Sequence, residues 1–125
     1  MKKIIETENA PTPAGPYSQG IKVDRFLFVS GQIAIDPKQG KIVATNIKEQ
    51  TKMVMENIKA ILQAAKYNLT DIVQANVYLS SMQLFIEFNN IYATYFDKDF
   101  PARTTAEAKL PQNALVEISA IAHKE

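Results

Sequence analysis

Cysteine is absent from this chain of 125 residues, and histidine occurs once, as His123. The lack of cysteine excludes disulfide bonds, thiol nucleophiles and cysteine metal ligands. One imidazole near the end of the chain supplies neither the ligands of a zinc site nor the base of a serine–histidine–acid triad, and we expect His123 to be a frayed terminal residue. Four glycines, at positions 15, 20, 31 and 40, form neither a dinucleotide fingerprint nor a phosphate loop. The sequence therefore predicts no metal site and no nucleotide site.

An excess of charge of either sign is also missing. The chain contains fourteen lysines and arginines and thirteen aspartates and glutamates, which gives a net charge of +1. The lysines are scattered, so neither a nucleic acid nor a membrane surface is an expected partner. No apolar run approaches the length of a membrane-spanning helix, and the start of the chain does not read as a secretory signal. We expect a cytoplasmic protein.

Hydrophobic residues make up 46% of the chain, which favours one globular domain over residues 1–125. Apolar positions spaced by three and four predict a helix from Ile47 to Ala65, with Asn46 and Glu49 as its N-terminal cap. A second helix is expected over residues 82–96, with an aromatic stripe and a serine cap at Ser80 or Ser81. Strands are expected in five regions, namely 2–6, 25–36 with a short hairpin to 41–43, 71–79, 103–109 and 114–123.

This order of elements predicts an α+β fold in which two helices pack on one face of a single sheet. In the strand 71–79 we expect Val73, Ala75, Val77 and Leu79 to share the buried face. The last strand is apolar on both faces, since Val116 and Ile118 point one way and Leu115 and Ile121 the other. The sheet face without helices is therefore expected to be covered by another copy of the chain.

Arg103 is a lone cation just after Phe-Pro-Ala. One interpretation is a corner arginine that caps carbonyl groups or pairs with Asp97 or Asp99. The other is a clamp for a carboxylate ligand, because a guanidinium offers a rigid fork of donors that matches a carboxylate.

Glu117 is a lone anion in the apolar last strand, and it too has two interpretations. It could be a polar residue on a half-exposed face, or a carboxylate that orients a water molecule and relays a proton. A regular hairpin of residues 103–109 with 114–123 would place Glu117 opposite Ala106 and Arg103 on the other face. A one-residue bulge would reverse that result, and the two groups could instead meet across a subunit boundary.

Residues of the loop "GPYSQG" and of "SGQ" complete the list of candidates. Tyr17 could cover a ligand or pack on a neighbouring subunit. Ser18, Ser30, Gly31 and Thr105 are further polar groups or glycines beside apolar residues.

Six ordered blocks cover the chain from about Asn9 to Ala122, and together they resemble the RidA (YjgF-like) family of imine/enamine deaminases. They are "APTPAGPYSQGI", "FVSGQIAID", "IKEQTKMVMENIKAIL", "FNNIYATYF", "FPARTT" and "LVEISAIA". The resemblance implies a chorismate-mutase-like fold with a single mixed sheet, a homotrimer with its sheets as an inner barrel, and ligand clefts between subunits. It further implies hydrolysis of 2-imino or 2-enamino acids, such as 2-aminoacrylate and 2-iminobutanoate, without a cofactor.

The resemblance also implies roles for individual residues. Arg103 matches the carboxylate-binding arginine of the family and Glu117 its water-positioning glutamate. The remaining substrate-binding positions fall on Tyr17, Ser30, Gly31, Asn89 and Thr105. Three departures from the family pattern stand out. The segment from Arg103 to Pro111 is one residue shorter, Ala106 stands where a larger apolar residue is expected, and Lys66 and Tyr67 stand where a helix-ending glycine is usual.

Overall fold

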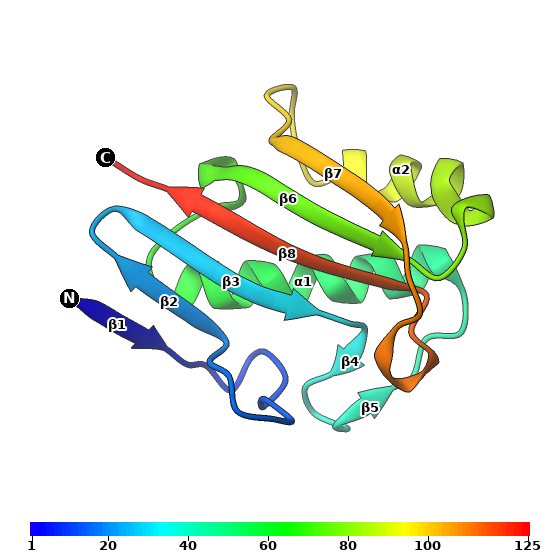
Figure 1. The fold of residues 1–125 in the computed structure, drawn as a ribbon, viewed down its shortest axis with the longest axis horizontal. Helices are drawn as coiled ribbons and strands as arrows, with labels where there is room; N and C mark the ends of the chain where they lie inside the picture. The colour runs from blue at the N-terminus through cyan, green and yellow to red at the C-terminus, as the bar shows by residue number, and fades with distance from the viewer.

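The computed structural model describes residues 1–125, which form one six-stranded sheet with both helices on the same face (Figure 1). The α+β fold is thus confirmed. The strands, in spatial order, are β1 (Lys2–Ile5), β2 (Gly20–Val23), β3 (Phe26–Gln32), β8 (Val116–His123), β6 (Ile72–Leu79) and β7 (Ala102–Glu107). The sheet is mixed, because β6 and β7 are parallel while all other neighbours are antiparallel. A separate small hairpin joins β4 (Ile35–Asp36) to β5 (Lys41–Ile42).

The helix α1 (Ile47–Ala64) lies along the sheet and supplies much of the core. The Asn46 side chain accepts a hydrogen bond from the Glu49 N–H at 2.8 Å, as the sequence predicts. At the other end Lys66 has φ 65°, the left-handed conformation that favours glycine. The N–H groups of Lys66 and Tyr67 donate to Gln63 and Leu62, so the usual helix-ending hydrogen bonds form around a lysine. The departure from the family pattern therefore changes the residue but keeps the turn.

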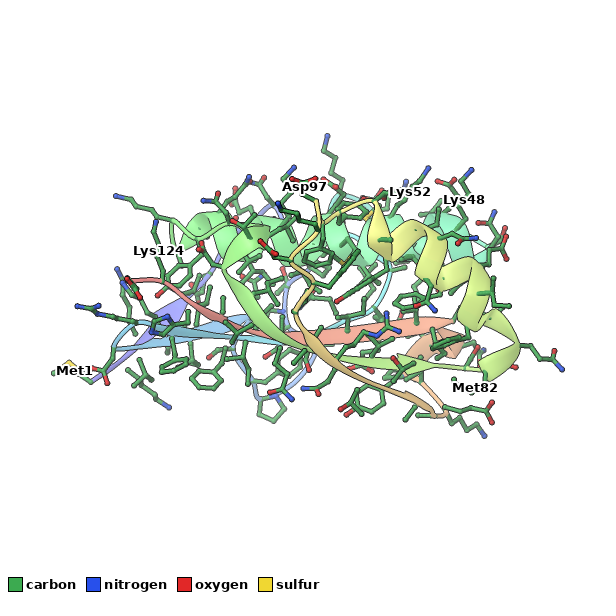
Figure 2. The ribbon with its side chains drawn as sticks, turned by 90° about the horizontal axis from the view of Figure 1, so that it is seen from above. Met1, Lys48, Lys52, Met82, Asp97 and Lys124 are labelled. Atoms are coloured by element: carbon green, nitrogen blue, oxygen red, sulfur yellow. The ribbon has the colours of Figure 1, made fainter.

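The helix α2 (Phe85–Ala93) follows a short 3₁₀ turn, Met82–Leu84, and covers the β6–β7 end of the same sheet face (Figure 2). Ser81 caps the 3₁₀ turn by accepting a hydrogen bond from the Gln83 N–H. Along α2 and the segment after it, neighbouring ring centroids lie 5.0–5.9 Å apart in the series Phe88, Tyr92, Phe96 and Phe100. Two other 3₁₀ turns are Leu69–Asp71 and Pro111–Asn113.

The structure corrects three expectations. The strands 102–107 and 116–123 do not form a hairpin, because β6 lies between them and pairs with both. Val73 is 47% exposed and Ile72 is buried in its place, because the β6–β8 pairing shifts register between Ile72 and Gln74. His123 is not frayed: it pairs with Phe26 in the β3–β8 ladder, with ring centroids 4.8 Å apart. In addition, β2 is a strand that the sequence pattern did not indicate.

The sheet face opposite the helices is apolar and uncovered. In the last strand Val116, Ile118, Ala120 and Ala122 are buried under the helices, while the alternate residues are half-buried on the open face. Five large hydrophobic side chains of the strands remain exposed: Ile4, Phe26, Phe28, Val73 and Tyr78. None of the helices is both long and apolar enough to cross a membrane.

Candidate functional site

The strand β3 is irregular at Ser30 and Gly31. Val29 pairs with Ala120 and Gln32 pairs with Ile118, so two residues of β3 stand opposite one residue of β8. Such a bulge bends a strand and redirects its side chains, and bulges are frequent beside active sites. The Ser30 N–H donates to the Gln19 carbonyl at 2.9 Å, and the Ser30 hydroxyl donates to the Ser18 carbonyl at 2.5 Å. The bulge is thereby tied to the loop that precedes β2.

Glu117 lies on the open face of β8, directly against the Gly31 backbone. A Cβ atom at Gly31 would overlap the Glu117 carboxylate, so glycine leaves room for this side chain in its observed position. Gly31 does not have a positive φ, and the requirement is therefore one of space. Burial raises the pKa of the Glu117 carboxyl above its usual value. A carboxylate with a raised pKa is a stronger base, which suits it to hold a water molecule and accept its proton.

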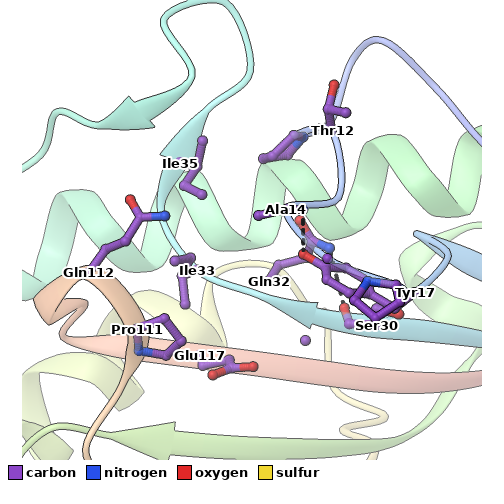
Figure 3. A pocket seen from close by; sticks show the side chains of 14 residues that line it. Thr12, Ala14, Tyr17, Ser30, Gln32, Ile33, Ile35, Pro111, Gln112 and Glu117 are labelled. Carbon is purple, nitrogen blue, oxygen red and sulfur yellow. Dashed lines mark hydrogen bonds between the residues drawn. The ribbon is translucent and has the colours of Figure 1, made fainter.

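A cavity of ≈ 500 Å³ opens in front of this carboxylate. The polar part of its lining includes Ser30, Gly31 and Glu117, and the apolar part includes Ile33, Ile35 and Pro111. Figure 3 shows Glu117 and Ser30 on neighbouring strands, with Tyr17 beside Ser30 and with Pro111 and Gln112 at the other end. Four of the residues expected to form the site, namely Tyr17, Ser30, Gly31 and Glu117, thus line one cavity.

Tyr17 stands on the loop at the edge of the cavity and is 51% exposed. Its hydroxyl oxygen accepts a hydrogen bond from the Ala14 N–H at 3.3 Å, and its own N–H donates to the Gly15 carbonyl. The ring is thus curled back over its own loop, and in this single chain it packs on no neighbour.

Arg103 lies in a different place, on the helix-covered face of the edge strand β7. Its guanidinium carbon is 5.0 Å from the ring centroid of Tyr92, 5.6 Å from Phe88 and 5.7 Å from Phe85. The only ion pair of the chain is Lys52–Glu49, so neither Asp97 nor Asp99 is the partner of Arg103. Aromatic faces hold a guanidinium in place without neutralising its charge. The arginine is therefore a fixed cation without a counter-ion.

The elements that carry Arg103 and its aromatic rings, β7 and α2, also carry polar atoms without partners. The Asn89 Oδ1, the Tyr92 Oη and the Thr105 Oγ1 are buried and make no hydrogen bond. Burial raises the pKa of the Tyr92 hydroxyl, and the Arg103 charge lowers it to a smaller extent. Buried polar groups are rarely left unpaired, and each one costs about 1–3 kcal/mol. Tyr92 lies under the guanidinium, and Asn89 and Thr105 stand on the same helix and strand as the stacked rings and Arg103, so a polar ligand here would find unpaired hydrogen-bonding groups.

The expected residues therefore form two groups on opposite faces of the sheet. Arg103 pairs with Ala75, which is buried under the helices, whereas Glu117 pairs with Tyr78 on the open face. From the sheet register, the two residues are separated by about 10 Å across two strand spacings and about 10 Å along three residues. Within one chain the carboxylate and the guanidinium cannot contact the same small ligand.

Several site residues did not stand out in the sequence. Phe85, Phe88 and Tyr92 have the spacing of an ordinary core stripe, and nothing in that spacing shows that Arg103 stacks on them. Gln112 lines the cavity from a loop in which both Gln112 and Asn113 have φ 56°. Left-handed conformations are unusual for residues other than glycine, and they are frequent at functional sites. No cluster of three or more His, Cys, Asp or Glu side chains could hold a metal ion.

Comparison with known proteins shows the family. The family model described as Endoribonuclease L-PSP, which represents the YjgF/RidA proteins, matches residues 7–124. The chain belongs to the RidA family. A RutC family protein of Pyrococcus horikoshii is 56% identical over the whole of both chains. The 2-iminobutanoate/2-iminopropanoate deaminase of Bos taurus is 42% identical, over 98% of this chain and 90% of the bovine protein.

Solved structures of RidA proteins share the fold. A Rid family protein of Yersinia pestis, YyfA, superimposes with a TM-score of 0.96 at 43% identity and covers 99% of this chain and all of its own. The E. coli protein TdcF, solved with bound serine, superimposes with a TM-score of 0.94 at 36% identity, over 98% of this chain and 99% of its own. The arrangement of two helices on one mixed sheet is therefore that of the RidA family.

The contact between Gly31 and Glu117 can be tested with a double-mutant cycle. We expect Gly31→Ala to lower the melting temperature slightly, because the new Cβ forces the Glu117 side chain out of its position. In the background Glu117→Ala the same substitution should cost little, because the space is then free. Thermal unfolding of the four proteins checks this. Additive effects of the two substitutions would show that Gly31 is required for another reason.

The raised pKa of Glu117 predicts a stability effect that depends on pH. Because its pKa in the folded protein exceeds the unfolded value, the ionised carboxylate destabilises the fold at pH 7, and this penalty vanishes below the unfolded value of about 4.3. We therefore expect Glu117→Gln to raise the melting temperature by a few degrees at pH 7 and to leave it unchanged near pH 3.5. Glu8→Gln, at an exposed position, serves as the control. A gain that persists unchanged at pH 3.5 would contradict the assignment.

Proposed function

We propose that this protein hydrolyses 2-imino and 2-enamino acids, such as 2-iminopropanoate, 2-aminoacrylate and 2-iminobutanoate, to the 2-keto acid and ammonia. The observation that carries the proposal is the Arg103 guanidinium, which is held over three aromatic rings and lacks a counter-ion. A free guanidinium fork binds a carboxylate with two parallel hydrogen bonds. Each proposed substrate carries a carboxylate next to the reacting carbon.

The chemistry requires little more than positioning. Water adds to C2 of the imine, the C2–N bond then breaks, and the products are the keto group and ammonia, so no oxidant or cofactor is needed. Arg103 fixes the substrate carboxylate, and Glu117 accepts a proton from the attacking water and returns it to the departing nitrogen. Polar groups near Gly31 and Thr105 bind the nitrogen end. Holding both reactants in place removes much of the barrier to such a reaction.

The proposed site lies between subunits, because the two groups of residues cannot join within one chain. A second copy that brings the Arg103 edge of its sheet to the Glu117 cavity would complete the site. The apolar open face, with Phe26, Phe28 and Tyr78 exposed, would be covered in the same assembly. We propose a homotrimer with three such sites, in which the open faces line the inside of a barrel. A head-to-tail contact repeated around a three-fold axis closes such a ring.

The relatives support this substrate class. The bovine relative is named for 2-iminobutanoate and 2-iminopropanoate. The TdcF structure holds serine, which, like the proposed imino acids, carries its carboxylate on the carbon that bears the nitrogen. The bound serine also favours a second candidate function. A trimer could bind small amino or keto acids as a sensor without turning them over. Binding of 2-ketobutyrate without any imine hydrolysis would favour that function, and turnover would reject it.

The family description Endoribonuclease L-PSP names another activity, cleavage of RNA. The chain offers little for it. Its net charge is +1, and its one histidine packs its ring against Phe26. Binding to a polyanion depends on clusters of lysine and arginine that neutralise phosphates. We therefore do not propose RNA as a substrate.

The proposal predicts a specific pattern of kinetic defects. With 2-iminobutanoate generated enzymatically, Arg103→Met should lower kcat/KM roughly 100-fold, because a bidentate charged contact to the substrate is lost. Arg103→Lys should retain part of the activity, since a lysine keeps the charge but not the fork. Release of ammonia and of 2-ketobutyrate measures the rate.

The control for this experiment is Lys48→Met, which removes the same charge at an exposed position of α1. It should leave kcat/KM within twofold of the wild type. Equal activity of Arg103→Met and the wild type would remove the proposed role of Arg103 and, with it, the proposed substrate class.

A further inference from the structure

The loop between β1 and β2 carries Tyr17 and forms one wall of the cavity, yet it has almost no regular structure. Three prolines and one glycine lie between residues 11 and 16. Between Thr7 and Ser18 the only backbone–backbone hydrogen bond outside regular elements joins the Tyr17 N–H to the Gly15 carbonyl. A loop of this length pays a large entropic cost for a single conformation unless other contacts hold it. Hydrogen bonds from outside the loop backbone must therefore hold this loop in its conformation.

The side chain that does so is Gln19, which is buried with 3% exposure. Its Oε1 accepts a hydrogen bond from the Thr7 N–H at 2.7 Å. Its Nε2 faces three carbonyl oxygens of the loop, at 2.8 Å from Pro11, 3.1 Å from Thr7 and 3.3 Å from Ala10. One carboxamide thus satisfies backbone groups at the start and in the middle of the loop, as a neighbouring strand would.

The main chain of the same residue ties the loop to the catalytic side of the cavity. The Gln19 carbonyl accepts the hydrogen bond of the Ser30 N–H, and Ser30 precedes Gly31, the residue against which Glu117 lies. Gln19 therefore connects the loop that bears Tyr17, through its side chain, with the bulge of β3, through its backbone. It lines no part of the cavity itself.

We propose that Gln19 is a positioning residue that holds the Tyr17 loop closed against the bulge and so sets the affinity of the site for its substrate. This inference rests on the proposed function. A loop that is closed only part of the time lowers the apparent affinity by the closed fraction, while the chemical step in the closed state is unchanged. Loss of the Gln19 side-chain hydrogen bonds therefore raises KM more than it lowers kcat.

The test uses Gln19→Met, which keeps the length of the side chain and removes every hydrogen bond of the carboxamide. We expect KM for 2-iminobutanoate and the dissociation constant for 2-ketobutyrate to rise at least tenfold, with kcat within about threefold of the wild type. Amide hydrogen exchange should accelerate at least tenfold at the hydrogen-bonded amides of residues 7–18, namely Thr7, Asn9, Ala14 and Tyr17, and remain unchanged in α1. The variant Gln19→Glu can accept from Thr7 but cannot donate to the three carbonyls, so it should share the defect.

The matched control is Gln50→Met. Gln50 is also 3% exposed, and its carboxamide bonds to Ala44 and Leu115 instead of the loop. It should lower the melting temperature without accelerating exchange in residues 7–18. Unchanged exchange in that segment for Gln19→Met, or faster exchange spread evenly over the chain, overturns the inference.

The exchange experiment separates this inference from the proposed function. If the wild type neither binds 2-ketobutyrate nor hydrolyses the imine, the proposed function fails, and so does the claim about affinity. Exchange in residues 7–18 still decides whether Gln19 holds the loop. If the wild type is active and Gln19→Met keeps its KM, the positioning role fails alone.

Discussion

The parallel pairing of β7 with β6 determines where Arg103 and Glu117 lie in the single chain. Because β6 stands between β7 and β8, the last two strands are not neighbours, and the register assigns Arg103 to the helix-covered face and Glu117 to the open face. Their separation leaves the cation without a counter-ion, and under the proposed function a second copy of the chain completes the site.

Each half of the proposed site is held by contacts that do not depend on the other half. The Arg103 half depends on aromatic rings of α2, which fix the guanidinium without neutralising it. The Glu117 half depends on the bulge of β3, where Gly31 leaves space for the carboxylate, and on Gln19, which ties the Tyr17 loop to that bulge. Two rigid halves that meet at an interface need little reorganisation when a ligand binds, which favours affinity for a small molecule.

The sequence predicts those features that are local. Neighbouring residues determine the cap at Asn46, the helical spacing after Ile47 and the alternation along β8. The structure confirms all of these features. Pairing between distant strands is not local. The short spacing between residues 109 and 114 favours a hairpin, yet the chain between β6 and β7 forms α2 and returns parallel to β6, which spacing cannot show. The same limit applies to Val73, which a bulge turns outward.

The site residues divide in a similar way. The motifs that resemble the RidA family point to Arg103, Glu117, Tyr17, Ser30, Gly31, Asn89 and Thr105, and the structure places them in two groups. Their roles in catalysis stay predictions. The rings under Arg103 and the hydrogen bonds of Gln19 depend on side-chain geometry across the fold, and a single sequence does not contain that information. The positive φ of Lys66 is a case where a resemblance expects glycine and the backbone adopts the same turn without it.

The central claim is that Arg103 of one subunit and Glu117 of another act on the same substrate. Complementation tests it most directly: Arg103→Ala and Glu117→Gln proteins are unfolded together, refolded as a mixture and assayed for imine hydrolysis. Each variant alone should be nearly inactive, whereas random mixing restores about a quarter of the wild-type sites, because each interface is intact when the two wild-type residues face each other. A mixture that is no more active than the separate variants, although mixed oligomers form, would contradict the claim.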